Sequence, residues 1–168
     1  PLVVMNVMNA FGERQHPEKF IPLCINKINA GEEITIHSYA GAEKAGSRWY
    51  IHARNIAGAV LFVLEHGTHG EKYNVQGEIE LDNLEVAQFV AKELGKPLKY
   101  KMHDNPTSRP GHDLRYALDG DKLRTLGWNL PLTFWDSLRR TIRWMVQNPD
   151  WLDEKNFGMK NFAEFEDK

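Results

Sequence analysis

The chain has 168 residues, which suits one domain or one lobe of a larger protein, and its 42% hydrophobic and 26% charged residues are ordinary for a globular protein. A formal net charge of −2 argues against a general nucleic-acid or membrane-surface binder, because both need an excess of basic residues. Cys24 is the single cysteine, which excludes an internal disulfide and a cysteine-based zinc site and favours a small buried side chain. No apolar run reaches the length of a bilayer span and no signal peptide is visible, so we expect a cytoplasmic protein.

The sequence opens with an apolar run, residues 2–8, that predicts a buried strand. Because a strand buried on both faces needs neighbours, we expect that part of a larger sheet precedes the chain. A polar loop at 9–16 follows, and we expect Pro17 at the first position of a helix that Gly31 ends. The apolar side chains of this helix recur at helical spacing: Ile21, Cys24, Ile25 and Ile28.

The middle of the chain alternates short strands, loops and helices. The expected segments, in order, are a strand at 34–37, a loop at 39–47, a strand at 49–52, a helix at about 54–65, a turn at 67–70 and a strand at 72–75. Asp82 and Glu85 then have the spacing of a capping box, which predicts the start of a helix that Gly95 ends. A strand at 98–102 is expected to follow.

Two more helices are predicted toward the C-terminus. Asp119 is expected to cap a short helix that ends at Gly127, and Thr133 with Asp136 to cap a long helix that stops before Pro149. Together with the strands, these elements predict the α/β class, as a small lobe with short strands, about five helices and many loops.

The segment 109–119 gathers basic side chains around a Pro110-Gly111 turn, namely Arg109, His112 and Arg115. A guanidinium is planar, always charged and able to hold oxygen atoms in pairs, so this segment suits a phosphate or pyrophosphate. The alternative is a surface turn with solvated charges.

The residues of this chain do not form a complete catalytic set. A G-x-G-x-x-G turn, a Walker-type phosphate loop and a G-x-S-x-G elbow are all absent from the sequence. His66 and His69 are three residues apart but lack a clustered third ligand, so we expect no metal site. No tyrosine is followed by a lysine four positions later.

Five segments in register, spread over residues 3–152, resemble the C-terminal half of the extended short-chain dehydrogenase/reductase family, also called the NAD-dependent epimerase/dehydratase family. The segment 109–119 is similar to the family's R-P-G-H-D-x-R-Y-A-x-D. The other four are 6–12 (N-x-x-N-x-Y-G), 16–22 (P-E-K-L-I-P), 71–75 (G-E-x-Y-N-I) and 126–149, which contains Leu-Gly-Trp, Thr-Phe and Asn-Pro. The chain is most similar to the nucleotide-sugar 4,6-dehydratases of the dTDP-glucose type.

The resemblance implies that another half of the protein performs the chemistry. In this family an N-terminal Rossmann half binds NAD and supplies a Y-x-x-x-K pair and, in the dehydratases, an acidic pair. Residues 1–152 would be the C-terminal nucleotide-sugar-binding lobe with the terminal strands of an incomplete Rossmann sheet, and 153–168 a charged tail. We expect no catalytic residue in this chain, no activity of the chain alone, and a full-length homodimer that acts on a nucleotide-diphosphate sugar such as dTDP-glucose.

The resemblance also assigns roles to single residues. The implied contacts are to the substrate phosphates for Asn9, Lys19, Phe20, Arg109 and His112, to the nucleobase for Ile36 and His37, to the nucleotide for Asn83, and to the nicotinamide of NAD for Val7. The family's phosphate arginine is shifted to Arg48 or lost, and its aspartate is Arg54.

Two further departures from the family's pattern bear on the substrate. Ala10 stands in place of a second asparagine, and His37 stands in place of the tyrosine that stacks on the base. The sequence therefore does not decide which nucleobase the substrate carries. The alternatives are a 4-epimerase or decarboxylase of the same family, a non-catalytic nucleotide-sugar-binding module, and a structural or dimer-forming lobe that binds nothing.

Overall fold

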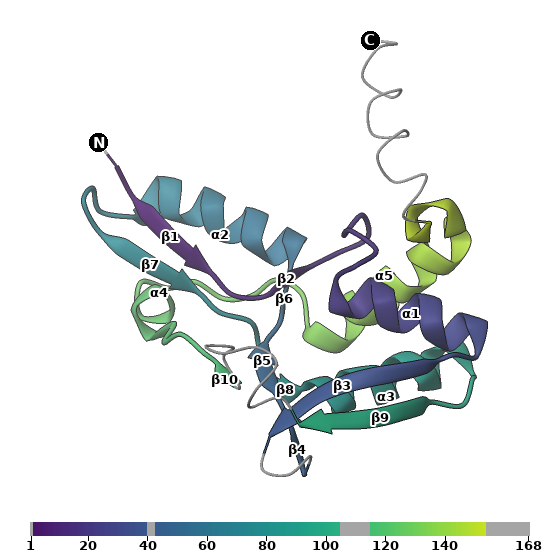
Figure 1. Ribbon diagram of the computed structural model, residues 1–168. Helices are drawn as coiled ribbons and strands as arrows, with labels where there is room; N and C mark the ends of the chain where they lie inside the picture. The colour runs from purple at the N-terminus through teal and green to yellow at the C-terminus, as the bar shows by residue number, and fades with distance from the viewer. Residues whose placement is uncertain (1, 40–42, 105–114, 154–168) are drawn as a thin grey trace.

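The computed structural model describes residues 2–39, 43–104 and 115–153 (Figure 1). Within these residues the chain forms five α-helices, one 3-10 helix and short strands in four small sheets. This mixed architecture confirms the α/β class and the expected number of helices. The side chains pack into two separate cores.

The larger core lies between helices α1 (Phe20–Ala30), α3 (Asn83–Leu94) and α5 (Phe134–Gln147) and strand β3 (Glu33–Tyr39). Strand β3 pairs in parallel with β9 (Lys99–Asp104) and antiparallel with the short β4 (Lys44–Ala45). Its most completely buried side chains include Cys24, Ile25, Ile34, Ile36, Val86 and Leu138. The helical spacing that predicted α1 is therefore the spacing of the positions that enter this core.

The smaller core lies on the other side of the molecule, under the parallel strands β1 (Val4–Val7) and β7 (Lys72–Val75) (Figure 1). Helices α2 (Ala53–His66) and α4 (Asp121–Thr125) complete it. Its buried members are Met8, Ile51, Ala59, Val63, Tyr73, Val75, Leu123 and Trp128.

Two small sheets join the cores. Strand β2 (Ala10–Phe11) pairs in parallel with β6 (Ile51–His52). The remaining sheet has β5 (Ser47–Trp49) at its centre, flanked by β8 (Glu80–Asp82) and β10 (Arg115–Tyr116). The 3-10 helix η1 (Pro149–Leu152) follows α5, and the carbonyl oxygen of Leu152 accepts a hydrogen bond from Asn26 on α1.

The helix ends test the predicted caps. Asp82 and Glu85 form the predicted capping box, and Gly31 and Gly95 end their helices with positive φ angles of 71° and 63°. The placement of Pro17 is wrong, because Lys19 is the N-cap of α1 and Pro17 lies before it.

The short helix α4 and the first strand differ from their predictions. Gly120, not Asp119, is the N-cap of α4, and the carboxylate of Asp119 accepts from the backbone N–H of Asp121 at 2.8 Å. Strand β1 is half-buried rather than buried on both faces, and Asn6 in it is exposed. Within the described residues its sheet partner is β7 alone.

Candidate functional site

A cavity of about 510 Å³ opens where the N-terminal ends of α1 and α3 approach strands β2, β3 and β5. Its lining residues are Asn9, Ala10, Phe11, Gln15, Lys19, Phe20, Ile21, His37, Arg48, Tyr50 and Asn83. They come from segments far apart in the sequence, so the fold rather than one motif builds this site. Six of them are positions that the family resemblance assigned to substrate: Asn9, Lys19, Phe20, His37, Arg48 and Asn83.

Four assigned residues are not among those lining the cavity. Ile36 is fully buried in the larger core, because neighbouring residues of β3 point to opposite faces and His37 occupies the cavity side. Val7 is half-buried and packs against the smaller core. Arg109 and His112 lie outside the described residues.

Asn9 follows the carboxyl end of β1, next to the joining sheet. Its backbone oxygen accepts a hydrogen bond from Ile51 N at 3.0 Å, which fixes the main chain at this point. Its side-chain Oδ1 is buried and has no hydrogen-bond partner among the described residues. Ligands of parallel α/β sheets bind beyond the carboxyl ends of strands, so Asn9 stands where such a ligand would be met.

The start of α1 presents backbone donors to the cavity. Lys19 is its N-cap in an extended conformation, no side chain caps the helix, and its first turn holds no acidic residue. The N–H groups of Phe20 and Ile21 therefore lie at an uncapped helix start whose dipole favours an anion. Lys19 Nζ lies 3.1 Å from Glu18 Oε1, and this hydrogen bond lowers the pKa of the exposed Glu18 carboxyl.

The described lining of the cavity carries basic but no acidic side chains. Arg48 on β5 is 9% exposed, and its Nη1 donates to the carbonyl oxygen of Ser47 at 2.7 Å. His37 lines the same cavity from β3. Arg48 and the α1 start therefore give the cavity a positive character that suits a phosphate-bearing ligand, and the exposed Lys19 adds to it although Lys19 also pairs with Glu18.

Arg115, which the sequence suggested as a further basic group, is neutralised by the carboxylate of Glu80. Its Nε and Nη2 each lie 2.8 Å from an oxygen of Glu80, in a bidentate pair. Ser47 Oγ also donates to Glu80, at 2.6 Å. The hydrogen bond from Arg115 is the main reason that the pKa of Glu80 is lowered.

Sequence reasoning missed Tyr50, which lies between β5 and β6 and lines the cavity. Its hydroxyl donates to Asn83 Oδ1 at 2.6 Å, and Tyr50 is 6% exposed. Arg48 and Tyr50 are two residues apart in extended chain, so they can face the same side. This two-residue spacing is the sequence signal that could have identified Tyr50 as a second lining residue beside Arg48.

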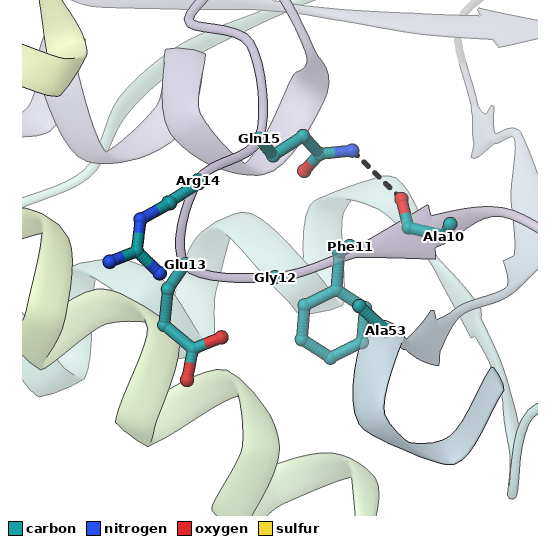
Figure 2. Close-up of a pocket in the computed structure, with 7 residues that line it drawn as sticks. All are labelled: Ala10, Phe11, Gly12, Glu13, Arg14, Gln15 and Ala53. Carbon is teal, nitrogen blue, oxygen red and sulfur yellow. Dashed lines mark hydrogen bonds between the residues drawn. The ribbon is translucent and has the colours of Figure 1, made fainter. Parts of the chain in front are cut away.

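A second pocket, of about 400 Å³, lies beside the first and is lined by segment 10–15 and Ala53 (Figure 2). Figure 2 shows Gln15 reaching back to the carbonyl oxygen of Ala10, to which its Nε2 donates at 2.8 Å. Ala10, Phe11 and Gln15 line both pockets. Segment 10–15 is therefore the wall between them.

This wall is held by a buried polar cluster. His52 is 1% exposed; its Nε2 lies 3.1 Å from Glu13 Oε2, and its Nδ1 accepts from Arg54 N at 3.2 Å. A neutral histidine protonated on Nε2 satisfies both contacts. Desolvation lowers the pKa of His52 against the opposing effect of Glu13.

The other oxygen of Glu13 binds α5. Arg140 Nε lies 2.9 Å from Glu13 Oε1, so the wall is tied to the larger core. Burial raises the pKa of Glu13, but a backbone hydrogen bond and the electrostatic attraction of neighbours such as Arg140 outweigh it, and the net direction is down. The next residue, Arg14, stacks on the rings of Trp144 and Trp151.

The described residues also bear on metal binding, membrane spans and cysteine reactivity. No group of three potential metal ligands occurs in it, and none of its helices has both the length and the apolar character needed to cross a membrane. Cys24 is fully buried, which confirms the expected buried side chain, and burial raises the pKa of its thiol to about 12.

Comparison with known proteins gives one consistent result. Residues 1–75 match the model of the NAD dependent epimerase/dehydratase family. A dTDP-glucose 4,6-dehydratase of Streptomyces niveus is 35% identical over 151 residues, which cover 89% of this chain and 43% of that protein. The chain is thus similar to this family in its first 75 residues, and to part of a dTDP-glucose 4,6-dehydratase over most of its length. This confirms the resemblance that the sequence motifs indicated.

Solved structures of a dehydratase and of an epimerase share the fold. The dTDP-glucose 4,6-dehydratase of Streptomyces venezuelae, crystallised with NAD and TYD bound, matches with a TM-score of 0.77 and 33% identity over 90% of this chain and 45% of that one. The UDP-glucose 4-epimerase of Thermus thermophilus has the same fold, with a TM-score of 0.75 at 23% identity over 86% of this chain and 46% of that one. The chain spans less than half the length of the relatives it matches.

Proposed function

We propose that the chain is the nucleotide-sugar-binding part of a dTDP-glucose 4,6-dehydratase, a lyase that removes water from the hexose. One observation carries this proposal: six residues that a family resemblance assigned to substrate line a single cavity. The sequence identity of 33–35% to two dTDP-glucose 4,6-dehydratases supports the choice of reaction.

The cavity offers a suitable group for each part of a nucleotide diphosphate. Lys19, Arg48 and the N–H groups at the start of α1 would hold the diphosphate through charge and hydrogen bonds. Asn9 and Asn83 would bind its oxygens or hydroxyls. The flat ring of His37 would pack on the nucleobase.

Arg109 and His112 keep their proposed roles as predictions from the resemblance. Arg109 and His112 would add charge to the diphosphate. Ile36 has its side chain in the larger core and would act only by holding the strand that carries His37.

The chemistry would come from groups that this chain does not supply. NAD would take and return a hydride, and an N-terminal half would hold it, because this chain has no glycine-rich dinucleotide turn. Val7, at the carboxyl end of β1, offers only an apolar contact to the nicotinamide. We assign residues 1–152 to the binding lobe and 153–168 to a tail, and we expect a cytoplasmic homodimer in the full-length enzyme and no activity of the chain alone.

A 4-epimerase of the same family is the second candidate. It is favoured by His37, which stands where the base-stacking tyrosine is expected and leaves a UDP-sugar open as substrate. The two reactions differ in their products, since the dehydratase product has lost one water and the epimerase product keeps the mass of its substrate.

The test combines binding and product mass. We expect calorimetry to show saturable binding of dTDP-glucose to the chain and weaker binding of ADP-glucose. We expect no product from the chain alone, and a product lighter by one water when the chain is fused to an N-terminal half from one of its dehydratase relatives. A product of unchanged mass from such a pairing would favour the epimerase, and the absence of binding to any nucleotide sugar would contradict the proposal.

A further inference from the structure

We infer that Tyr50 positions Asn83 so that the Nδ2 donors of Asn83 face the cavity, which makes this pair a recognition element for the acceptor oxygens of a nucleotide diphosphate. The inference rests on the proposed function and adds to it a residue that the family pattern did not assign. Tyr50 acts here as a positioning residue through Asn83.

The contact between the two side chains is short and joins distant parts of the chain. Tyr50 Oη lies 2.6 Å from Asn83 Oδ1, and both residues line the cavity. A distance of this size suits an O–H···O bond, which is typically about 2.7–2.8 Å, better than an N–H···O bond of about 2.9–3.0 Å. The hydroxyl therefore donates to the amide oxygen, and the NH₂ group of Asn83 is turned away from it.

Tyr50 is fixed firmly enough to impose this orientation. It is 6% exposed, and its ring packs against Phe134 with the ring centres 6.2 Å apart. A Cβ added to Gly77 would overlap the carbonyl oxygen of Tyr50, so the backbone of Tyr50 is closely covered as well. Burial raises the pKa of Tyr50 well above its usual range, so the hydroxyl keeps the proton that it donates.

Asn83 is fixed at the other end. It is the first residue of α3, directly after the N-cap Asp82, which forms the capping box with Glu85. Its backbone N–H donates to Gly46 O at 3.0 Å. With the backbone and Oδ1 both held, the remaining freedom of the side chain is small. Within the described residues no protein acceptor binds Asn83 Nδ2, so its two N–H donors are available to a ligand.

The chemistry of these donors defines what they recognise. An amide NH₂ binds acceptor oxygens, such as those of a phosphate or a base carbonyl. Without the Tyr50 hydroxyl, the amide could rotate by half a turn and present its oxygen, which would repel the same ligand. The contribution of Tyr50 is thus to remove the wrong orientation before the ligand arrives.

The first part of the experiment needs no ligand. In ¹⁵N-labelled protein, we expect Tyr50→Phe to shift or broaden the Nδ2 resonances of Asn83. Tyr73→Phe is the matched control, because Tyr73 is another buried tyrosine whose hydroxyl is hydrogen-bonded, to Thr68 N in the smaller core. It should leave the Asn83 resonances unchanged. Equal behaviour of the two variants would overturn the inference.

The second part measures the affinity for dTDP by calorimetry. We expect Tyr50→Phe to weaken binding by between about twofold and tenfold, the range for one neutral hydrogen bond. Asn83→Asp keeps an acceptor for Tyr50 but replaces the NH₂ group by a carboxylate oxygen, so it should weaken binding more than Tyr50→Phe does. In an Asn83→Ala background, Tyr50→Phe should have no further effect.

The outcomes separate the two proposals. If the wild-type chain binds dTDP and Tyr50→Phe binds it equally well, or if the two substitutions add independently, the positioning role is wrong and the proposed function stands. If the Asn83 resonances respond to Tyr50→Phe but the wild-type chain binds no nucleotide diphosphate, the proposed function fails, and recognition by this pair fails with it.

Discussion

The two cores of this chain differ in how completely their elements are covered. The larger core closes around side chains such as Ile25 and Leu138, both with 0% exposure. Beside the smaller core, the outer face of α2 leaves Leu61 and Leu64 exposed, at 64% and 77%, and β1 has a single described strand partner. The cavity is built on the closed side, where α1, α3 and β3 meet. A binding site needs rigid walls, and the buried residues of the larger core, such as Ile21 and Phe11, contribute to the lining of this cavity.

The same contrast appears in the polar groups. Around the larger core, Glu13 is held by the buried His52 and by Arg140 on α5, and Asn83 is held by the buried Tyr50, so contacts to buried side chains help to fix the cavity walls. Around the smaller core, the ion pairs of α4 lie at the surface, where they contribute little to stability. Substitutions should therefore have unequal effects in the two regions.

The largest expected effect is on stability. Leu138→Ala should lower the free energy of unfolding by about 2–5 kcal/mol, because it empties a fully buried position of α5. Leu64→Ala, the matched substitution on the exposed face of α2, should change it by no more than about 0.5 kcal/mol. Urea denaturation measures both. Similar losses in the two variants would mean that both leucines are equally covered in solution.

The next effect is on ligand affinity. Arg48→Ala should weaken dTDP binding by about 1.5–3 kcal/mol, roughly tenfold to a hundredfold or more, because a charged hydrogen bond is lost. Arg124→Ala, on α4 beside the smaller core, is the control and should bind like the wild type. Calorimetry gives the affinities, and thermal unfolding shows whether each variant is folded. Unchanged affinity in folded Arg48→Ala would remove Arg48 from the site.

A third effect depends on pH. Because desolvation lowers the pKa of His52, the unfolded chain takes up a proton there more readily than the folded chain does. The free energy of unfolding should therefore decline as the pH falls through about 6.5, the pKa of histidine in the unfolded chain. It should decline further below about 4.5, because Glu13, whose pKa is lowered in the folded chain, is then protonated more readily in the unfolded chain. Urea denaturation across this range measures it. His52→Gln should abolish the first decline, and a wild type that is equally stable at pH values of about 7.5 and 5.5, on either side of that unfolded value, would contradict the assignment.

The smallest effect on stability comes from the exposed face of α2. Replacing Leu61 and Leu64 together by lysine should change the free energy of unfolding by about 0.5 kcal/mol or less per site, because both side chains are exposed. The same change should reduce self-association, since it removes an exposed apolar stripe. Sedimentation at several concentrations tests this. Loss of the folded state would show that the stripe is covered within the chain.

Local signals predicted the helices well. The capping box at Asp82 and the terminal Gly95 predicted both ends of α3, because a capping residue and a left-handed glycine act over one turn. The strands β2, β4, β8 and β10 were missed, since two or three residues are too few to show a period. The expected strand at 49–52 is divided between β5 and β6 around Tyr50.

The site was predictable only in part. Lys19, Asn9 and His37 were assigned through the resemblance, whereas segment 109–119 suggested phosphate binding from its own basic residues. The alternation of β3 could have predicted that only one of Ile36 and His37 faces the cavity, because neighbouring strand residues face opposite sides. The contact between Tyr50 and Asn83 spans 33 positions and depends on how β5 meets α3, which no local pattern reveals.

One measurement tests the central claim most directly: an NMR titration of the ¹⁵N-labelled chain with dTDP, UDP, GDP and ADP in turn. The account predicts saturable shifts at Asn9, Lys19, His37 and Asn83, strongest with dTDP, and unshifted resonances on the outer face of α2. A preference for UDP or GDP at the same residues would keep the site and change the substrate. Shifts at none of these residues with any nucleotide would contradict the account.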